Sequence, residues 1–169
     1  MAAVLVIARG EYHAPVYGRN DWKTGSGRSV MLNDINDELI LVARLLLATL
    51  FLIFGWRKLR DYSGTVTQLV QLGAPTPVMA AAVAIFMELP VAFAVAVGAF
   101  ARPAALLLVL YTLGTAFIGH RYWTITGADR VDTMDGFYKD LSIMGGFLLL
   151  SITGAGRYSI DALCGIAVP

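Results

Sequence analysis

The sequence predicts an all-α membrane protein, a four-helix transmembrane bundle preceded by an N-terminal soluble extension. Of its 169 residues, 57% are hydrophobic and only 15% are charged, whereas soluble domains are about half apolar and about a quarter charged. The apolar residues also gather in runs close to the roughly 20 residues that a helix needs to cross a bilayer. A soluble protein with such runs would expose too much apolar surface. We therefore expect a multi-pass protein of the cell (inner) membrane, in contact with the lipid bilayer.

Four runs predict the membrane helices, and Leu and Ala dominate each of them without the alternation typical of strands. The predicted helices cover residues of about 39–56, 78–100, 103–119 and 138–155. Pro103 is a good opening residue for the third helix. Because only two residues separate the second helix from the third, these helices must pack antiparallel. The fourth run has the fewest apolar residues, so a buried re-entrant segment is the alternative there.

The polar first part of the chain predicts a separate region. Residues 1–36 are interpreted as an extension that lies on the membrane surface or docks a partner, and residues 37–169 as the bundle. Residues 120–137 are predicted to be the longest irregular segment inside the bundle, and long loops of that kind are often functional.

Up-and-down topology predicts which polar residues share a membrane face. Lys58, His120, Lys139 and Asp140 are expected near one face, and Arg44 near the other. Arg44 lies only about a turn and a half inside its helix, so its guanidinium can reach the interface by snorkelling. As sequence neighbours on one helix, Lys139 and Asp140 point about 100° apart, so we expect only one of them to face the centre.

Glu88 is the most informative polar residue, because it lies near the middle of the second predicted helix. A carboxylate at mid-bilayer is costly, and such residues usually face the bundle interior with a partner. Glu88 is therefore either functional or a structural hydrogen-bond hub. On the first helix, Phe51, Gly55 and Lys58 fall on one face with Arg44. A basic rim, one deep carboxylate and aromatic walls suit a quinone or a proton path.

Composition excludes several other classes of function. Net charge is +1, so the chain has no basic field that would attract nucleic acid. A single cysteine excludes a redox pair and a cysteine-built metal site. The two histidines cannot supply paired haem ligands, since His13 lies outside the bundle. No phosphate-binding loop or hydrolase motif is present, so we expect no intrinsic cofactor, no metal and no autonomous enzyme.

Several short motifs follow one another along the chain in a characteristic order. They are Arg44, Phe54-Gly55-Trp56-Arg57-Lys58-Leu59, Leu72-Gly73-Ala74-Pro75, Met87-Glu88-Leu89-Pro90 with Gly98, His120-Arg121-Tyr122-Trp123, Lys139-Asp140-Leu141 with Gly145-Gly146, and Gly154-Ala155-Gly156-Arg157-Tyr158-Ser159-Ile160-Asp161. In order and spacing this set resembles the DoxX family of small bacterial and archaeal membrane proteins. Members of that family often carry Asn where Asp140 stands, and they typically begin near the first helix.

The resemblance implies a four-helix membrane bundle and, more weakly, a function. Some members are associated with quinone-linked sulfur oxidation, as a membrane subunit of thiosulfate:quinone oxidoreductase, and others with redox-stress membrane complexes. Because fold analogy alone does not establish function, both associations are expectations for this chain.

Two main hypotheses and a third, weaker one follow for function. In the first, the chain is a membrane subunit of a quinone-linked oxidoreductase or respiratory complex, with Glu88, Lys58, His120 and Lys139 lining a quinone or proton pocket. Lys58 or Lys139 would stabilise a quinol oxyanion and Glu88 or His120 would deliver protons, while electrons come from a partner protein. The alternative is a non-catalytic membrane anchor or assembly subunit of a larger complex, and a small transporter is a third, weaker interpretation.

Overall fold

The computed structural model describes residues 22–166, with side chains from residue 36 onward. Contacts divide the chain into two units, residues 1–34 and residues 35–169. In the described residues all regular secondary structure is helical, as the sequence predicts. The role expected for residues 1–36 concerns a segment that falls mostly outside the described residues, and it stays a prediction.

The first helix, α1 (Trp22–Arg60), contains an apolar stretch, Asn36–Arg60, that is long enough to cross a membrane. The predicted helix, 39–56, lies within it. The prediction stopped at the end of the apolar run, whereas the helix continues through a last turn that carries Arg57, Lys58 and Arg60. Basic side chains at this position favour the helix because they complement the negative end of its dipole.

The second membrane helix is built from three segments, α3 (Pro77–Phe86), the π-helix η1 (Met87–Val91) and α4 (Ala92–Val97). Pro90 inside η1 has no N–H to donate to the preceding turn, and π-helical bulges accommodate such interruptions. The helix ends at Gly98, whose φ of 71° is left-handed and typical of a glycine C-cap. The predicted range 78–100 therefore ran a few residues into the turn.

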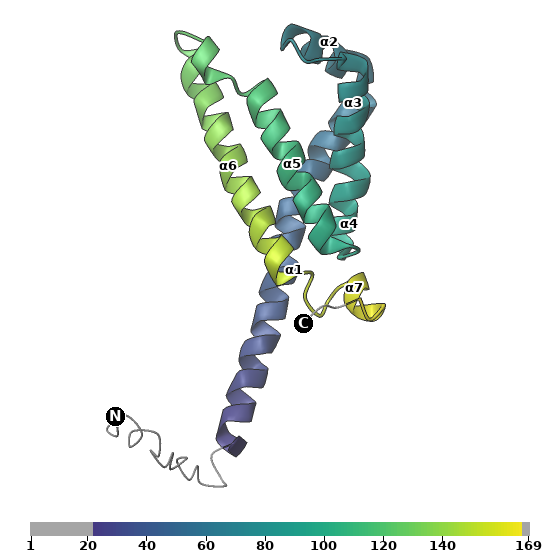
Figure 1. The fold of residues 1–169 in the computed structure, drawn as a ribbon, viewed down its shortest axis with the longest axis vertical. Helices are drawn as coiled ribbons and strands as arrows, with labels where there is room; N and C mark the ends of the chain where they lie inside the picture. The colour runs from purple at the N-terminus through teal and green to yellow at the C-terminus, as the bar shows by residue number, and fades with distance from the viewer. Residues whose placement is uncertain (1–21, 167–169) are drawn as a thin grey trace, which may run out of the picture. The chain divides into compact units, whose positions relative to one another are not determined.

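The third helix, α5 (Ala101–Gly119), follows at once and runs back beside α4 (Figure 1). The antiparallel packing expected from the short link is confirmed. A 3₁₀ turn, η2 (Tyr122–Thr124), then leads to α6 (Asp129–Thr153), which packs along α5.

Helix α6 differs from the predicted fourth helix, 138–155, because it begins earlier. The prediction of an irregular segment over 120–137 is therefore wrong for residues 129–137. Asp129 and Asp132 lie in the first turn of α6, where carboxylates favour a helix. Three helical stretches, Asn36–Arg60, Pro77–Val97 and Ala101–Thr124, are long and apolar enough to cross a membrane. Helix α6 is not among them, since charged residues occupy its first half.

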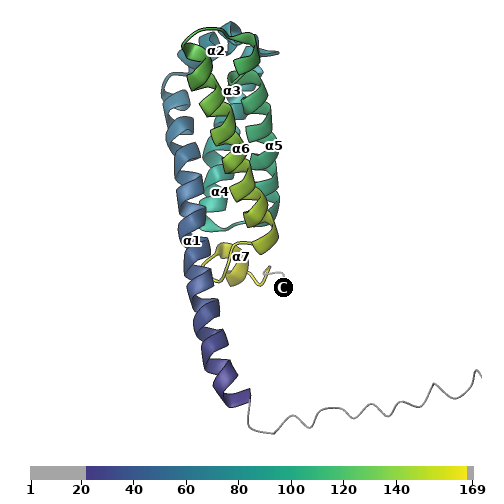
Figure 2. The ribbon, with the colours of Figure 1, turned by 90° about the vertical axis from the view of Figure 1, so that its left-hand side faces the viewer.

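Two short helices cover the ends of the second unit (Figures 1 and 2). At the end of α1, α2 (Tyr62–Gln71) starts at Asp61, whose carboxylate accepts the Gly64 N–H at 2.9 Å. Arg121 donates to the Leu72 carbonyl just after α2, and this bond joins two of the motifs noted above. The end of the second unit that carries α2 is called the Lys58 end. The opposite end carries α7 (Ile160–Leu163) and is called the tail end.

The core and the outer surface are both apolar, as a membrane protein requires. Phe51, Val95, Leu108 and Phe147 are buried at 0–6% exposure and pack into one cluster. Large apolar side chains also face outward. Leu46, Phe86 and Leu110 are 69%, 60% and 66% exposed. In water this surface would be unfavourable, whereas lipid covers it without cost.

Arg44 at the tail end is buried, with 1% exposure, and the expectation that it snorkels to the interface is wrong. Its Nε donates to the Ala96 carbonyl at 3.2 Å and its Nη2 to the Tyr158 carbonyl at 2.7 Å, while Nη1 donates to the Ala155 carbonyl. The guanidinium turns inward because the end of α4 and the chain after α6 offer backbone acceptors there. Arg44 therefore joins α1, α4 and the C-terminal tail.

Asp161 in α7 caps the start of α5. Its two carboxylate oxygens accept the N–H groups of Phe100 and Ala101 at 2.7 and 2.9 Å. We expect Asp161→Ala to lower the free energy of unfolding by about 1–2 kcal/mol, the usual cost of losing an N-terminal cap. Asp161→Asn, which keeps one acceptor oxygen, should lose less. Unfolding in mixed detergent micelles measures both, and equal losses would show that the cap is not what Asp161 contributes.

Candidate functional site: a buried carboxylate beneath the Lys58 end

Glu88 lies in η1 and is buried at 4% exposure. Its Oε1 forms an ion pair with Lys58 Nζ from α1 and accepts a hydrogen bond from the Tyr111 hydroxyl of α5 at 2.5 Å. The expectation that Glu88 faces the interior with a partner agrees with this geometry. Three helices therefore meet at one carboxylate oxygen.

The second oxygen, Glu88 Oε2, is buried and has no hydrogen-bond partner among residues 36–166. Buried polar atoms are nearly always paired, so an unpaired one needs an explanation. The Thr112 hydroxyl, next along the chain from Tyr111, is the other buried side-chain atom in this part of the chain without a partner. An unpaired carboxylate oxygen is an acceptor ready for a proton or for a ligand N–H or O–H group.

Gly55 explains why α1 approaches η1 so closely. A Cβ atom at Gly55 would lie 2.8 Å from Glu88 Cβ and 3.0 Å from the Glu88 backbone carbon, so only glycine fits. Lys58 follows one turn later and can reach the carboxylate. Glu88 and Pro90 both lie inside the π-helix η1, and single π turns inside helices are frequent at functional sites.

His120 lies at the end of α5 and pairs with Asp140 of α6, with His120 Nε2 3.7 Å from Asp140 Oδ2. The imidazole packs against Gly136, where a Cβ would be 2.4 Å from Nδ1. Among the described residues, no hydrogen bond or ion pair joins the His120–Asp140 pair to Glu88, so His120 lies near the same end as Lys58 without contacting the carboxylate.

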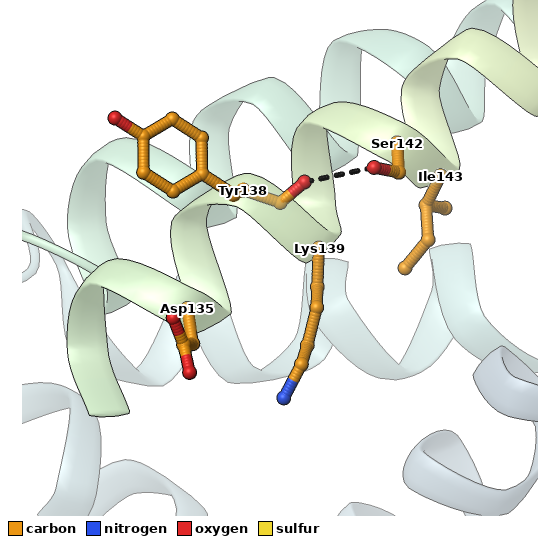
Figure 3. Close-up of a pocket in the computed structure, with 5 residues that line it drawn as sticks. All are labelled: Asp135, Tyr138, Lys139, Ser142 and Ile143. Atoms are coloured by element: carbon orange, nitrogen blue, oxygen red, sulfur yellow. Dashed lines mark hydrogen bonds between the residues drawn. The ribbon is translucent and has the colours of Figure 1, made fainter. Parts of the chain in front are cut away.

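Lys139 points elsewhere. It lines an open depression of about 530 Å³ on α6 with Asp135, Tyr138, Ser142 and Ile143 (Figure 3). The hydroxyl of Ser142 donates to the Tyr138 carbonyl within this face at 3.0 Å. Within residues 36–166, no ion pair involves Lys139. Of the two neighbours, Asp140 pairs with His120, and Lys139 does not.

Sequence reasoning missed Tyr111. A phenol inside an apolar helix needs a hydrogen-bond partner when it is buried, and Tyr111 lies at about the depth expected for Glu88, so that depth was the available signal. The four predicted site residues are therefore distributed over three places. Lys58 and Glu88 are in contact, His120 pairs with Asp140 at the end of α5, and Lys139 lies apart. Among the described residues, no group of His, Cys, Asp and Glu could hold a metal ion.

Comparison with known proteins shows which proteins the chain resembles. The DoxX family model matches residues 39–121. Inner membrane protein YphA of Escherichia coli is 48% identical over 123 residues, which cover 73% of this chain and 88% of the relative. The chain belongs to the DoxX family. Inner membrane protein YqjF of the same organism is 38% identical over 132 residues, or 78% of this chain and 96% of that protein. No solved structure matches the chain.

Membership explains the earlier motifs and establishes the location. Both relatives are named as inner membrane proteins, and this DoxX protein has three helical stretches suited to crossing a bilayer. It is therefore a multi-pass inner membrane protein. The matched region, 39–121, contains Lys58, Glu88, Tyr111 and His120, whereas Lys139 lies beyond it.

Proposed function

We propose that this DoxX protein is the membrane subunit of a quinone-linked oxidoreductase or respiratory complex, with α6 as a fourth transmembrane helix and a quinone or proton pocket around Glu88. One observation carries the proposal. Glu88 Oε1 holds both Lys58 and Tyr111, while Oε2 is buried and unpaired. A carboxyl group with one tethered and one open oxygen suits proton transfer to a bound ligand.

In this proposal each side chain has a defined role. The quinone accepts two electrons from the redox cofactor of a partner protein and two protons, and becomes a quinol. Glu88 takes up a proton that enters from the Lys58 end and passes it to the quinone through its open oxygen, once for each of the two protons. The Lys58 ammonium stabilises negative charge that develops on the quinone oxygen, and Tyr111 keeps Glu88 in place. His120 and Asp140 return protons from the surface. Lys139 lies apart from this pocket and has no step in the proposal.

The test is quinone binding by the purified protein before and after Glu88→Gln, which keeps the shape of the side chain and removes its charge. We expect the affinity for a short-chain quinone to fall about tenfold or more, which corresponds to at least roughly 1.4 kcal/mol. Asp135→Asn, the same type of change on an exposed residue, is the matched control and should bind normally. Unchanged affinity in Glu88→Gln would remove that residue from the pocket.

The alternative, a non-catalytic anchor or assembly subunit, is favoured by the bonds of Arg44 and Asp161, which only join parts of the chain. Under this alternative, Glu88→Gln lowers stability and leaves quinone binding as it was. Deleting residues 1–33 would then abolish association with partner proteins, while the rest of the chain stays folded. Co-purification from native membranes in mild detergent measures that association, with bound quinone assayed in the same sample.

A further inference from the structure

The ionisable groups around Glu88 all lead toward one end of the protein. Lys58 belongs to the last turn of α1, and its side chain is 30% exposed. From α5, Tyr111 donates to the same carboxylate. His120 and Asp140, whose side chains are 39% and 17% exposed, form an ion pair between the end of α5 and α6. The route from Glu88 through Lys58 therefore reaches solvent at the Lys58 end, where the His120–Asp140 pair also lies.

Toward the tail end, the interior offers no such route. From Glu88 to the end of α4 is about 14 Å at the helical rise. The side chains that fill this length are buried and apolar. They include Phe51, Val91, Val95, Leu108 and Phe147, with exposures of 0–8%. Closely packed hydrocarbon side chains, as in protein interiors generally, offer no hydrogen-bonding groups and leave no room for a chain of water molecules.

Beyond this apolar layer, the buried polar side chains are Arg44 and Ser159 among the described residues at the tail end. Arg44 donates to three backbone carbonyls. The Ser159 hydroxyl donates to Gly156 and accepts from the Ala162 N–H. An arginine stays protonated in proteins, so this one cannot pass a proton on. The tail end is thus closed by groups already engaged in other bonds.

We propose that Glu88 exchanges protons with only one side of the membrane, the side on which Lys58 lies. A proton moves from the Lys58 ammonium to the Glu88 carboxylate, which leaves a neutral amine and a neutral carboxyl group. The amine then takes a proton from water at the Lys58 end. In the proposed function, on which this inference rests for its biological role, quinone protons are taken up and released on one side, and none crosses the membrane through this chain.

The experiment uses the full-length protein in sealed phospholipid vesicles and a hydrophobic carbodiimide, which reacts with protonated carboxyl groups in apolar surroundings. Cys164 is the one cysteine of the chain, is exposed and lies at the tail end. A membrane-impermeant maleimide added outside therefore marks every molecule whose tail end faces outward. Intact-mass spectrometry then detects both adducts on the same molecule. The carbodiimide adduct that is missing from Glu88→Gln is the one that forms on Glu88.

With an acidic lumen and an alkaline exterior, we expect the Glu88 adduct in the maleimide-marked molecules, whose Lys58 end faces the lumen. Reversing the pH gradient should move the adduct to the unmarked molecules. The ratio of the adduct between the two populations should reverse severalfold with the gradient. In Lys58→Gln, labelling should slow because the ammonium that passes its proton to Glu88 is absent, and it should keep its dependence on the same side because the apolar layer still closes the tail end.

Equal labelling of both populations under either gradient would overturn the proposal, as would labelling that follows the pH at the tail end. No adduct in either the wild type or Lys58→Gln would also overturn it, because Glu88 would then exchange protons with neither side. The readout requires no quinone. One-sided labelling without quinone binding would therefore refute the proposed function alone, and quinone binding with two-sided labelling would refute this inference alone.

Discussion

Replacing Arg44 with methionine should lower the free energy of unfolding by about 3–5 kcal/mol, because three backbone carbonyls lose their donor and each buried polar group left unpaired costs about 1–3 kcal/mol. Methionine fills much of the same volume but donates no hydrogen bond. The carbonyls of Ala96, Ala155 and Tyr158 would then be left without this donor in an apolar region, where unpaired polar groups are costly. Reversible unfolding in mixed detergent micelles measures the loss.

Arg57→Met is the matched control for this change. Arg57 lies in the same helix but is exposed, with its guanidinium 5.8 Å from the Phe54 ring, and its loss should change stability by less than about 1 kcal/mol. Arg44→Lys should recover only part of the stability, because an ammonium group does not reproduce the spread of guanidinium donors. If Arg44→Met and Arg57→Met unfold alike, the bonds at the tail end contribute little.

Replacing Gly55 with alanine is expected to lower the free energy of unfolding by about 2–3 kcal/mol, as overpacking of a tight contact does. The new Cβ would lie 2.8 Å from Glu88 Cβ and 3.0 Å from the backbone of the same residue. Because backbone atoms cannot move aside as a flexible side chain can, α1 must shift away from η1. The shift also draws Lys58 away from Glu88, so quinone affinity should fall together with stability.

Gly145→Ala provides the comparison. Gly145 lies within α6, and a Cβ there would have no atom within 4 Å apart from its own helix backbone. Alanine is favoured over glycine in a helix by about 0.5–1 kcal/mol, so this variant should be as stable as the wild type or slightly more so. A Gly55→Ala protein that unfolds like Gly145→Ala would show that α1 and η1 do not need this close approach.

Sequence alone was sufficient for features that depend on depth and spacing. Glu88 lies in the middle of an apolar run, so its burial and its need for a partner could be predicted, and Gly55 and Lys58 share one helix face. The turn between the second and third helices followed from the length of the link. These inferences use side-chain polarity and helical period, both of which can be read from the sequence.

The features that could not be predicted depend on the backbone and on tertiary position. Arg44 was expected to reach the interface, whereas it binds backbone carbonyls inside the protein. Every residue has a carbonyl, so the sequence does not show which ones will accept these hydrogen bonds. The start of α6 was misplaced because Asp129 and Asp132 favour a helix without being apolar. The pairing of His120 with Asp140 joins the end of α5 to α6, and no sequence period relates residues on two different helices.

The long separation between Arg44 and its acceptors has a consequence for biogenesis. Its bonds to Ala155 and Tyr158 join residues 111 and 114 positions apart. When the first helix enters the membrane during translation, these acceptors have not yet been synthesised. The nascent chain must therefore hold Arg44 without these two acceptors until the segment after α6 has been made, and a chain truncated before Ala155 keeps an arginine that lacks two of its three carbonyl acceptors.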